Sequence, residues 1–398
     1  MPPVVTWVTT YRAFTALASG PTALHTLASV GGVAAYAWGA GGNSTLGNGS
    51  TANRNVPTAV STAGVLNGVV VTALAAGEGH SLALSGTGTV YAWGRGDSGR
   101  LGDGADVDRS TPVAVDTSGV LSGRQVTAIA AGGSHSLAVD SAGQVYAWGR
   151  AVSGRLGIGP TDPGYYARSP MSVALTATRI AAGSGHSLAL DPGGAVWAWG
   201  SGSSGALGNG STADADAPVA VDTSGALAGR TIVAVAAGTS HSLALDSTGR
   251  VYAWGAAADG QLGSGSTTGT SVPVAVDASG VLAGKTIVAV AAGGGHSLAL
   301  DSEGRVYAWG NGANGQLGDG TDGSGPRPLA VAVDTSGVLA GRSVVAIAAG
   351  NIHSLAIDSD GHAFAWGNDG YGQLGNGAFG AGGHSYATVP VAVDVSGL

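Results

Sequence analysis

The sequence of 398 residues contains no cysteine and a single lysine, Lys285, and only 10% of its residues are charged. Without cysteine, disulfides, thiolate catalysis and zinc–thiolate sites are excluded. No apolar run approaches the roughly 20 residues that a membrane-spanning helix needs, so we expect no membrane insertion. The first residues of the sequence lack a charged segment followed by an apolar stretch, so we expect no secretory signal peptide in them.

Positive charge is also scarce, because the formal net charge is −8 and no run of lysine or arginine occurs. A chain of this kind is a poor ligand for a phosphate backbone, and we expect no nucleic-acid partner. The bias toward arginine over lysine, with abundant alanine, glycine and valine, indicates a bacterial or phage gene.

Catalytic motifs are missing as well. The sequence has neither a Gly-x-Ser-x-Gly elbow nor a His-Glu-x-x-His pair, and its only glutamates are Glu78 and Glu303. The segment from Gly280 to Thr286 separates two glycines by three residues, whereas a phosphate-binding loop requires four. Similar segments recur at Arg230 and Arg342, so this one is a repeat connector. We therefore expect no enzyme activity and no cofactor.

What the sequence does contain is a repeat of seven units. A His-Ser-Leu-Ala motif, or His-Thr-Leu-Ala in the first unit, is followed about eleven residues later by aromatic-Ala-Trp-Gly and then by Leu-Gly. Successive motif histidines are 55, 55, 51, 55, 55 and 57 residues apart. The motif histidines are His25, His80, His135, His186, His241, His296 and His353, and the motif tryptophans are Trp38, Trp93, Trp148, Trp199, Trp254, Trp309 and Trp366.

Each unit predicts four strands. In the fifth unit, residues 232–237 form an apolar run typical of a buried strand, and residues 241–245 return after a short turn. A tight turn with glycine at its end leads to residues 251–254, and a long glycine-rich loop leads to residues 272–276. The proline in the last segment fits an edge strand.

These motifs resemble the RCC1 repeat, and the resemblance covers residues 14–394. It implies an all-β fold, a seven-bladed β-propeller of four-stranded antiparallel blades. The family includes a nucleotide exchange factor for a small GTPase, protein inhibitors such as a β-lactamase-binding propeller, and many uncharacterised bacterial proteins. Fold alone does not choose among these functions.

Two regions follow from the repeat: an N-terminal strand or tail over residues 1–13, and a single propeller domain over residues 14–398. We expect Val4–Val8 to lie against the outer edge near Pro390–Asp394 and to fasten the first blade to the last. The alternative is that the first dozen residues form an attachment tail.

The motif histidines and tryptophans are interpreted as architecture. Ligands in equivalent places of seven blades are too widely spread for one metal ion, so each imidazole is expected to satisfy a turn carbonyl. The tryptophans are expected to pack between blades, although sugar platforms are the alternative. Asp103, Asp106 and Asp108 lie within six residues on a glycine-rich loop, and they form a weak calcium candidate because Ca²⁺ prefers oxygen ligands.

The candidate binding surface is the face that carries the long loops between the third and fourth strands. These loops vary between units, whereas the opposite face is monotonous, and binding residues are usually mounted on variable loops. Two sectors are rich in residue types common at binding hot spots. The first contains Arg95, Arg100, Arg109, Arg150, Arg155, Tyr165, Tyr166 and Arg168, and the second contains Tyr371, Phe379, His384 and Tyr386.

The sequence therefore favours a non-enzymatic scaffold that binds a protein or glycan partner, alone or as part of a larger assembly, with an extracellular, cell-surface or virion location preferred. The alternatives are a regulatory protein, such as a guanine nucleotide exchange factor or an enzyme inhibitor, and an enzyme with its site in the central channel.

Overall fold

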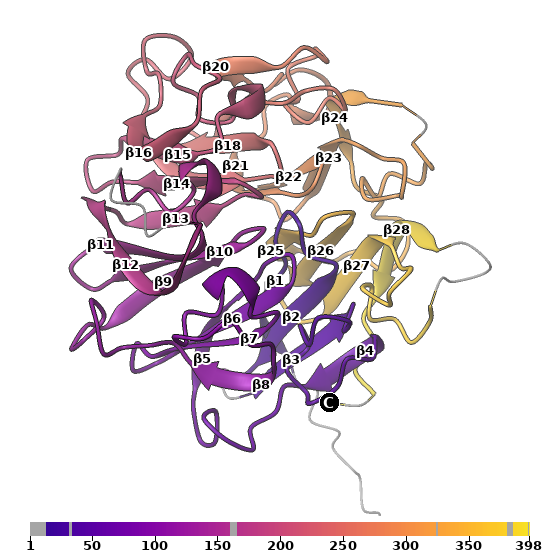
Figure 1. Cartoon of the computed structure of the whole chain (residues 1–398). Helices are drawn as coiled ribbons and strands as arrows, with labels where there is room; N and C mark the ends of the chain where they lie inside the picture. Colours follow the sequence, from indigo (N-terminus) through magenta and orange to yellow (C-terminus); the bar gives the residue numbers. More distant parts are fainter. Residues whose placement is uncertain (1–12, 32–33, 160–164, 324, 380–384, 397) are drawn as a thin grey trace, which may run out of the picture.

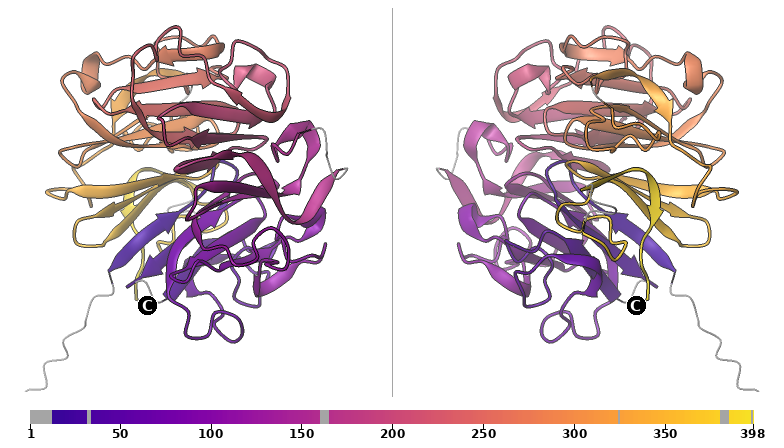
Figure 2. Two further views of the ribbon diagram at one scale, coloured as in Figure 1. Left: turned by 90° about the vertical axis from the view of Figure 1, so that its left-hand side faces the viewer. Right: turned by 90° about the vertical axis from the view of Figure 1, so that its right-hand side faces the viewer.

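A computed structural model describes residues 13–31, 34–159, 165–323, 325–379, 385–396 and 398. The structure contains seven sheets, and each sheet consists of four antiparallel strands that are consecutive in the chain. Figure 1 shows these blades arranged around a centre, and Figure 2 shows from two sides that the first blade (indigo) lies beside the last (yellow). The seven-bladed propeller that the repeat predicts is therefore confirmed.

The strands of the first four blades have the following bounds. Blade 1 comprises β1 (Phe14–Ala18), β2 (His25–Val30), β3 (Ala34–Gly39) and β4 (Arg54–Ala59); blade 2 comprises β5 (Val71–Ala76), β6 (His80–Ser85), β7 (Val90–Gly94) and β8 (Arg109–Ala114); blade 3 comprises β9 (Val126–Ala131), β10 (His135–Asp140), β11 (Gln144–Arg150) and β12 (Tyr166–Thr176); blade 4 comprises β13 (Arg179–Ala182), β14 (His186–Leu190), β15 (Val196–Gly200) and β16 (Ala215–Ala220).

The remaining blades repeat the pattern. Blade 5 comprises β17 (Ile232–Ala237), β18 (His241–Asp246), β19 (Val251–Gly255) and β20 (Thr270–Ala275); blade 6 comprises β21 (Ile287–Ala292), β22 (His296–Asp301), β23 (Val306–Gly310) and β24 (Arg327–Ala332); blade 7 comprises β25 (Val344–Ala349), β26 (His353–Asp358), β27 (Ala363–Asn368) and β28 (Tyr386–Ala392). Short 3₁₀ turns are η1 (Asp97–Gly99), η2 (Val152–Gly154), η3 (Ser203–Gly205) and η4 (Gly280–Leu282).

The burial of each strand explains its composition. The second and third strands of blade 5, β18 and β19, are buried along their whole length, which suits small and apolar residues on both faces. The fourth strand, β20, is only partly buried and contains Pro273. Because it lies at the outer edge of the sheet, the missing proline N–H removes no internal hydrogen bond.

The hydrophobic core is divided into clusters between neighbouring blades. In one of them, Leu243 and Val251 of blade 5 pack with Tyr307 and Trp309 of blade 6. The closing junction has the same composition, because Phe14 and Trp38 of blade 1 pack with Leu355 and other residues of blade 7. The ring is thus stabilised by packing between whole blades, which share no strand in the described part of the chain.

Backbone hydrogen bonds also close the ring. Phe14 N donates to Gly361 O at 2.9 Å, and Gly377 N donates to Asn55 O at 2.9 Å. The second bond has its counterpart between blades 1 and 2, where Gly49 N donates to Ser110 O at 2.8 Å. The predicted contact of Val4–Val8 with Pro390–Asp394 lies outside the described residues, since residues 1–12 are not among them.

Candidate functional site

The connections of the blades emerge on two faces. The turn between the first and second strands lies beside the loop between the third and fourth strands, as shown by the bond from Arg95 N to Gly79 O at 2.7 Å. We call this side the loop face. The other two connections meet on the opposite side, where Ser247 N donates to Thr231 O at 2.8 Å. We call this side the connector face.

Near the loop face, the motif histidines join consecutive blades. Each imidazole Nε2 lies within hydrogen-bond distance of a hydroxyl in the following blade: His25 with Ser81 at 2.8 Å, His80 with Ser136, His135 with Ser187, His186 with Ser242, His241 with Ser297, His296 with Ser354, and His353 with Thr26 at 3.2 Å. The last pair joins blade 7 to blade 1. The histidine partner is therefore a hydroxyl of the next blade and not the turn carbonyl expected from the sequence.

The hydroxyl fixes the role of the imidazole. Ser242 Oγ donates its own proton to Ala206 O at 2.9 Å, so it accepts from His186, and the histidine is the Nε2–H tautomer. The imidazoles are fully buried, and burial lowers the pKa of His186 to about 4 and that of His241 to about 3. Neutral rings with this tautomer act as hydrogen-bond donors between blades.

The motif tryptophans reach the same carbonyls. Trp254 Nε1 donates to Ala206 O at 2.9 Å, and Trp38 Nε1 donates to Gln373 O at 3.0 Å across the closing junction. Every motif tryptophan is completely buried, so none presents a platform to a ligand. One loop carbonyl in each blade thus accepts from both a tryptophan and a hydroxyl of the next blade.

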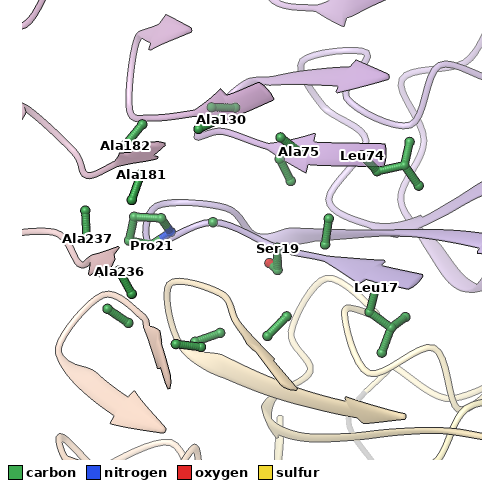
Figure 3. A pocket seen from close by; sticks show the side chains of 18 of the residues that line it. Leu17, Ser19, Pro21, Leu74, Ala75, Ala130, Ala181, Ala182, Ala236 and Ala237 are labelled. Atoms are coloured by element: carbon green, nitrogen blue, oxygen red, sulfur yellow. The ribbon is translucent and has the colours of Figure 1, made fainter. Parts of the chain in front are cut away.

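The central channel is lined almost wholly by small apolar side chains. Its cavity of about 270 Å³ is bordered by the inner strands, and Ser19 is its only polar side chain among the described residues. Pro21 lies in the midst of the inner strands in Figure 3, and its carbonyl accepts from Thr239 Oγ1 of blade 5 at 3.1 Å. The lining therefore offers no acid, base or metal ligand, and a turn of blade 1 crosses its loop-face mouth.

This crossing turn was missed by the sequence reasoning. Ala18 pairs with Leu27 in blade 1 as Ala75 pairs with Leu82 in blade 2, so by this register residues 20–24 stand where blade 2 has only residues 77–79. Gly20 is packed so closely that a Cβ would lie 2.0 Å from Ala76 O. The two extra residues before His25 were the available signal.

The first candidate sector contains arginines at two equivalent positions of blades 2 and 3. Arg95 and Arg150 follow the motif Trp-Gly, whereas Arg100 and Arg155 precede Leu-Gly. Arg95 and Arg150 are exposed, but the structure buries Arg100, whose guanidinium bonds to Asp97 at 2.9 Å. Arg100 therefore stabilises the loop from within, and its side chain is not accessible to a large partner.

The next arginines connect the long loops of blades 2 and 3. Arg109 pairs with Asp103 at 2.7 Å within its own loop, and Arg168 of blade 3 pairs with Asp106 of blade 2 at 2.6 Å. Arg168 also donates to Tyr166 Oη at 2.7 Å and lies over its ring. These contacts fasten the start of β12 in blade 3 to the long loop of blade 2.

The three aspartates of the calcium candidate already have partners within the protein. Asp103 and Asp106 bind different arginines, and Asp108 Oδ1 accepts from Gly96 N at 2.8 Å. Within the described ranges, the one group of three residues close enough to share a metal is Asp358, Asp360 and His362, on the connector face. Arg342 Nη1 already lies 2.5 Å from Asp358 and 2.9 Å from His362 Nδ1, so a cation is present there.

Arg150 and Arg155 differ from the other arginines of the sector, because neither forms an ion pair with any described residue. Arg155 donates from Nε to Val152 O at 2.8 Å and from Nη1 to Ser184 O at 3.3 Å. Burial and the positive charges of Arg150 and Arg100 lower the pKa of Arg155, although the guanidinium stays protonated. Asp214 and Glu78 act on Arg155 in the opposite sense but form no ion pair with it, so the sector keeps two arginines without a directly paired carboxylate among the described residues.

Both candidate sectors also contain exposed aromatic side chains. Tyr165 is 80% exposed beside Tyr166, and in the second sector Tyr371 and Phe379 are 43% and 56% exposed. Tyr386 begins β28 and is half-buried, whereas His384 lies outside the described residues. The two sectors belong to blades 2–3 and to blade 7, and no contact between them is found in the described part.

Family models match most of the chain. The RCC1-like domain matches residues 163–397, and the regulator of chromosome condensation (RCC1) repeat matches residues 34–84 and 87–139. Among curated proteins, the ultraviolet-B receptor UVR8 of Arabidopsis thaliana is 33% identical over 89% of this chain and 77% of its own length. The human E3 ubiquitin-protein ligase HERC2 is 35% identical over 88% of this chain, which corresponds to only 7% of HERC2.

Solved structures agree with the sequence matches. Saccharomyces cerevisiae Prp20p, described together with its binding to Gsp1p and histones, is 27% identical, with a TM-score of 0.75 and 91% and 86% of the two chains covered. Human WBSCR16 shares the fold, with 23% identity and a TM-score of 0.79 over 91% and 95% of the two chains.

These similarities support a protein-interaction or regulatory role. They come from plants, mammals and yeast, and they give no support to a bacterial or phage origin, an adhesive or virion role, or a glycan partner. Within the described residues, no helix is long and apolar enough to cross a bilayer.

Proposed function

Because the chain belongs to the RCC1 repeat family, we propose that it is a non-enzymatic scaffold that binds a protein partner through its loop face. The contact sector is formed by the long loops of blades 2 and 3, with Arg95, Arg150 and Arg155 as charged anchors and Tyr165 as an exposed aromatic anchor. The partner presents an acidic surface.

One observation carries this proposal: arginines occupy the same two positions in two neighbouring blades, and two of them lack a carboxylate partner among the described residues. An unpaired guanidinium on a rigid surface is ready to form charge-assisted bonds with a carboxylate. Arginine and tyrosine are also the residue types enriched in the centres of protein interfaces.

The rigidity of the sector supports the same function. The Arg168–Asp106 pair joins the two blades, and η1 and η2 give the backbone of Arg100 and Arg155 nearly the same conformation, with φ of −62° and −61°. Loops that are ordered before binding lose little conformational freedom when a partner binds. The apolar channel, which offers no catalytic group among the described residues, supports the non-enzymatic part of the proposal.

The proposal is tested by photo-crosslinking from single sites in cells. A benzoylphenylalanine replaces Tyr165 on the loop face or, as the matched control, Val345, which is 56% exposed at the connector-face end of β25. We expect a discrete protein adduct from position 165 that is absent from position 345. Adducts from position 345 alone would overturn the assignment of the face.

A regulatory exchange factor is the second candidate, and it rests on the 27% identity to Prp20p over most of both chains. Its test is the release of labelled GDP from purified small GTPases in the presence of the full chain. If the chain accelerated GDP release and Arg150→Gln abolished this effect, the exchange activity would be assigned to the same sector. If the chain left the release rate unchanged, the exchange-factor function would be rejected and only the scaffold function would remain.

A further inference from the structure

The residue before Leu-Gly occupies equivalent places at the loop face in all units. It is Thr45, Arg100, Arg155, Ala206, Gln261, Gln316 and Gln373 in blades 1 to 7. Six of these side chains carry polar atoms, and blade 4 alone has alanine. A small residue at this place is expected to leave space beside the following blade.

The neighbouring blades show how that space is normally filled. In blade 3, Arg155 reaches across to Ser184 O of blade 4. In blade 6, Gln316 folds back, with Oε1 accepting from Asn314 N at 2.8 Å and Nε2 donating to Asn311 Oδ1 at 3.0 Å. Ala206 can do neither. A hollow of about 220 Å³ lies there, and its lining includes Arg155, Ser184, His186, Ser201, Ser203 and Ser240.

The walls of this hollow offer hydrogen-bond donors and one positive charge. The hydroxyls of Ser184 and Ser240 form no hydrogen bond with a described residue, and Ser201 and Ser203 bond to each other at 3.0 Å. His186 at the base already donates Nε2–H to Ser242. Among the described residues no carboxylate lines the hollow, although Asp214 acts on Arg155 from outside it, so the chemistry of the lining suits an anion with several acceptor oxygens.

We propose that this hollow is the subsite for an aspartate or glutamate side chain in an acidic segment of the partner. The inference rests on the proposed function and deepens it by naming what the loop face recognises. A single guanidinium matches the single charge of a carboxylate, whereas a phosphate monoester carries about two charges near neutral pH and would call for a second cation. The neutral hydroxyls supply the remaining hydrogen bonds.

The test uses the full chain and a fluorescein-labelled peptide of seven glutamates, with seven glutamines as the uncharged comparison. We expect measurable, salt-sensitive binding of the glutamate peptide by fluorescence anisotropy, and none of the glutamine peptide. Ala206→Gln fills the hollow with the residue that blades 5–7 use there, and Arg155→Gln removes the cation. Each should weaken binding at least about tenfold, the loss expected for one charge-assisted contact.

Controls separate this inference from the proposed function. Gln316→Ala opens a hollow in blade 6 without a neighbouring arginine, and it should leave peptide binding unchanged. Wild-type affinity in Ala206→Gln would overturn the subsite, even if Arg95→Gln/Arg150→Gln weakened binding of the crosslinked partner and so upheld the loop face. Tighter binding of a phosphoserine peptide of equal length would overturn the carboxylate assignment.

Discussion

Seven neutral imidazoles, each donating to a hydroxyl of the next blade, form a ring of hydrogen bonds around the channel. The sequence indicated that the histidines were architectural, but it did not reveal their partner. The signal was present in the motif itself, because the Ser that follows each histidine faces the histidine of the preceding unit. Sequence spacing could not show these contacts, since six of them join residues 52 to 58 positions apart and the one between His353 and Thr26 joins residues 327 positions apart.

The histidines predict a specific loss of stability in mild acid. Burial lowers the pKa of His25, His241 and His296 to about 3 and that of His353 to about 4, against about 6.5 in an unfolded chain. Below pH 6.5 the unfolded state binds more protons, so stability is fully present above pH 6.5 and is lost as the pH falls. Each histidine contributes about 1.4 kcal/mol per pH unit in that window.

Urea unfolding at pH 7, 6 and 5 measures this effect. We expect the free energy of unfolding to fall with decreasing pH, with a slope that corresponds to the uptake of several protons on unfolding. His241→Gln should reduce this uptake by about one proton. Asp246 and Asp358 do not contribute in this range, because their burial is outweighed by hydrogen bonds, which lower the pKa of each below the usual value near 3.8. Equal stability at pH 7 and pH 5 would show that the imidazoles are not buried in the neutral form.

A second residue contact stabilises the connector side of the blades. Tyr252 Oη donates to Asp246 Oδ2 at 2.9 Å within blade 5. We expect Tyr252→Phe to reduce the free energy of unfolding by about 1 kcal/mol, the net value of a buried hydrogen bond. Tyr36→Phe is the matched control, because Val30 stands at the aspartate position of blade 1. Similar losses for both variants would refute a role of the carboxylate.

At the scale of the element, alternation and turn residues predicted most strands of the blades. Residues 232–237 form β17 as expected, and residues 251–254 lie in β19. The turn of blade 1 across the channel was not predicted. The two inserted residues indicate that the turn is longer, but they do not indicate where it lies. Only the three-dimensional ring brings Pro21 against Thr239 of blade 5.

The Leu-Gly elements give a prediction for backbone geometry. Gly208 has a φ of +69°, and a Cβ there would lie 2.6 Å from Trp254 Nε1. Gly208→Ala should therefore cost both left-handed strain and overpacking, about 2–4 kcal/mol together. Gly229→Ala is the control, because its φ of +67° is nearly the same but no atom lies within 4 Å. If denaturant unfolding showed the same loss of stability for Gly208→Ala and Gly229→Ala, the contact with Trp254 would not contribute to the loss.

At the scale of the whole molecule, the unit count and the face assignment followed from the sequence, but the depth of each side chain did not. Arg100 and Arg155 occupy equivalent positions, yet Arg100 is buried against Asp97 and Arg155 borders an open hollow. Two positions differ: blade 3 has Val152 where blade 2 has Asp97, and the following unit has arginine in one case and alanine in the other. Side-chain space at a blade junction therefore depends on two units at once.

The most direct measurement compares two charge-matched double variants of this chain. For each variant, the Kd for the partner identified by crosslinking is measured. Arg95→Gln/Arg150→Gln removes two exposed charges from the loop face, and Arg179→Gln/Arg250→Gln removes two from the connector face. We expect the first pair to raise the Kd about tenfold or more, as two charged contacts of roughly 1 kcal/mol each imply, and the second pair to leave it unchanged. An equal change in both, or a larger change from the connector-face pair, would contradict a binding site on the loop face.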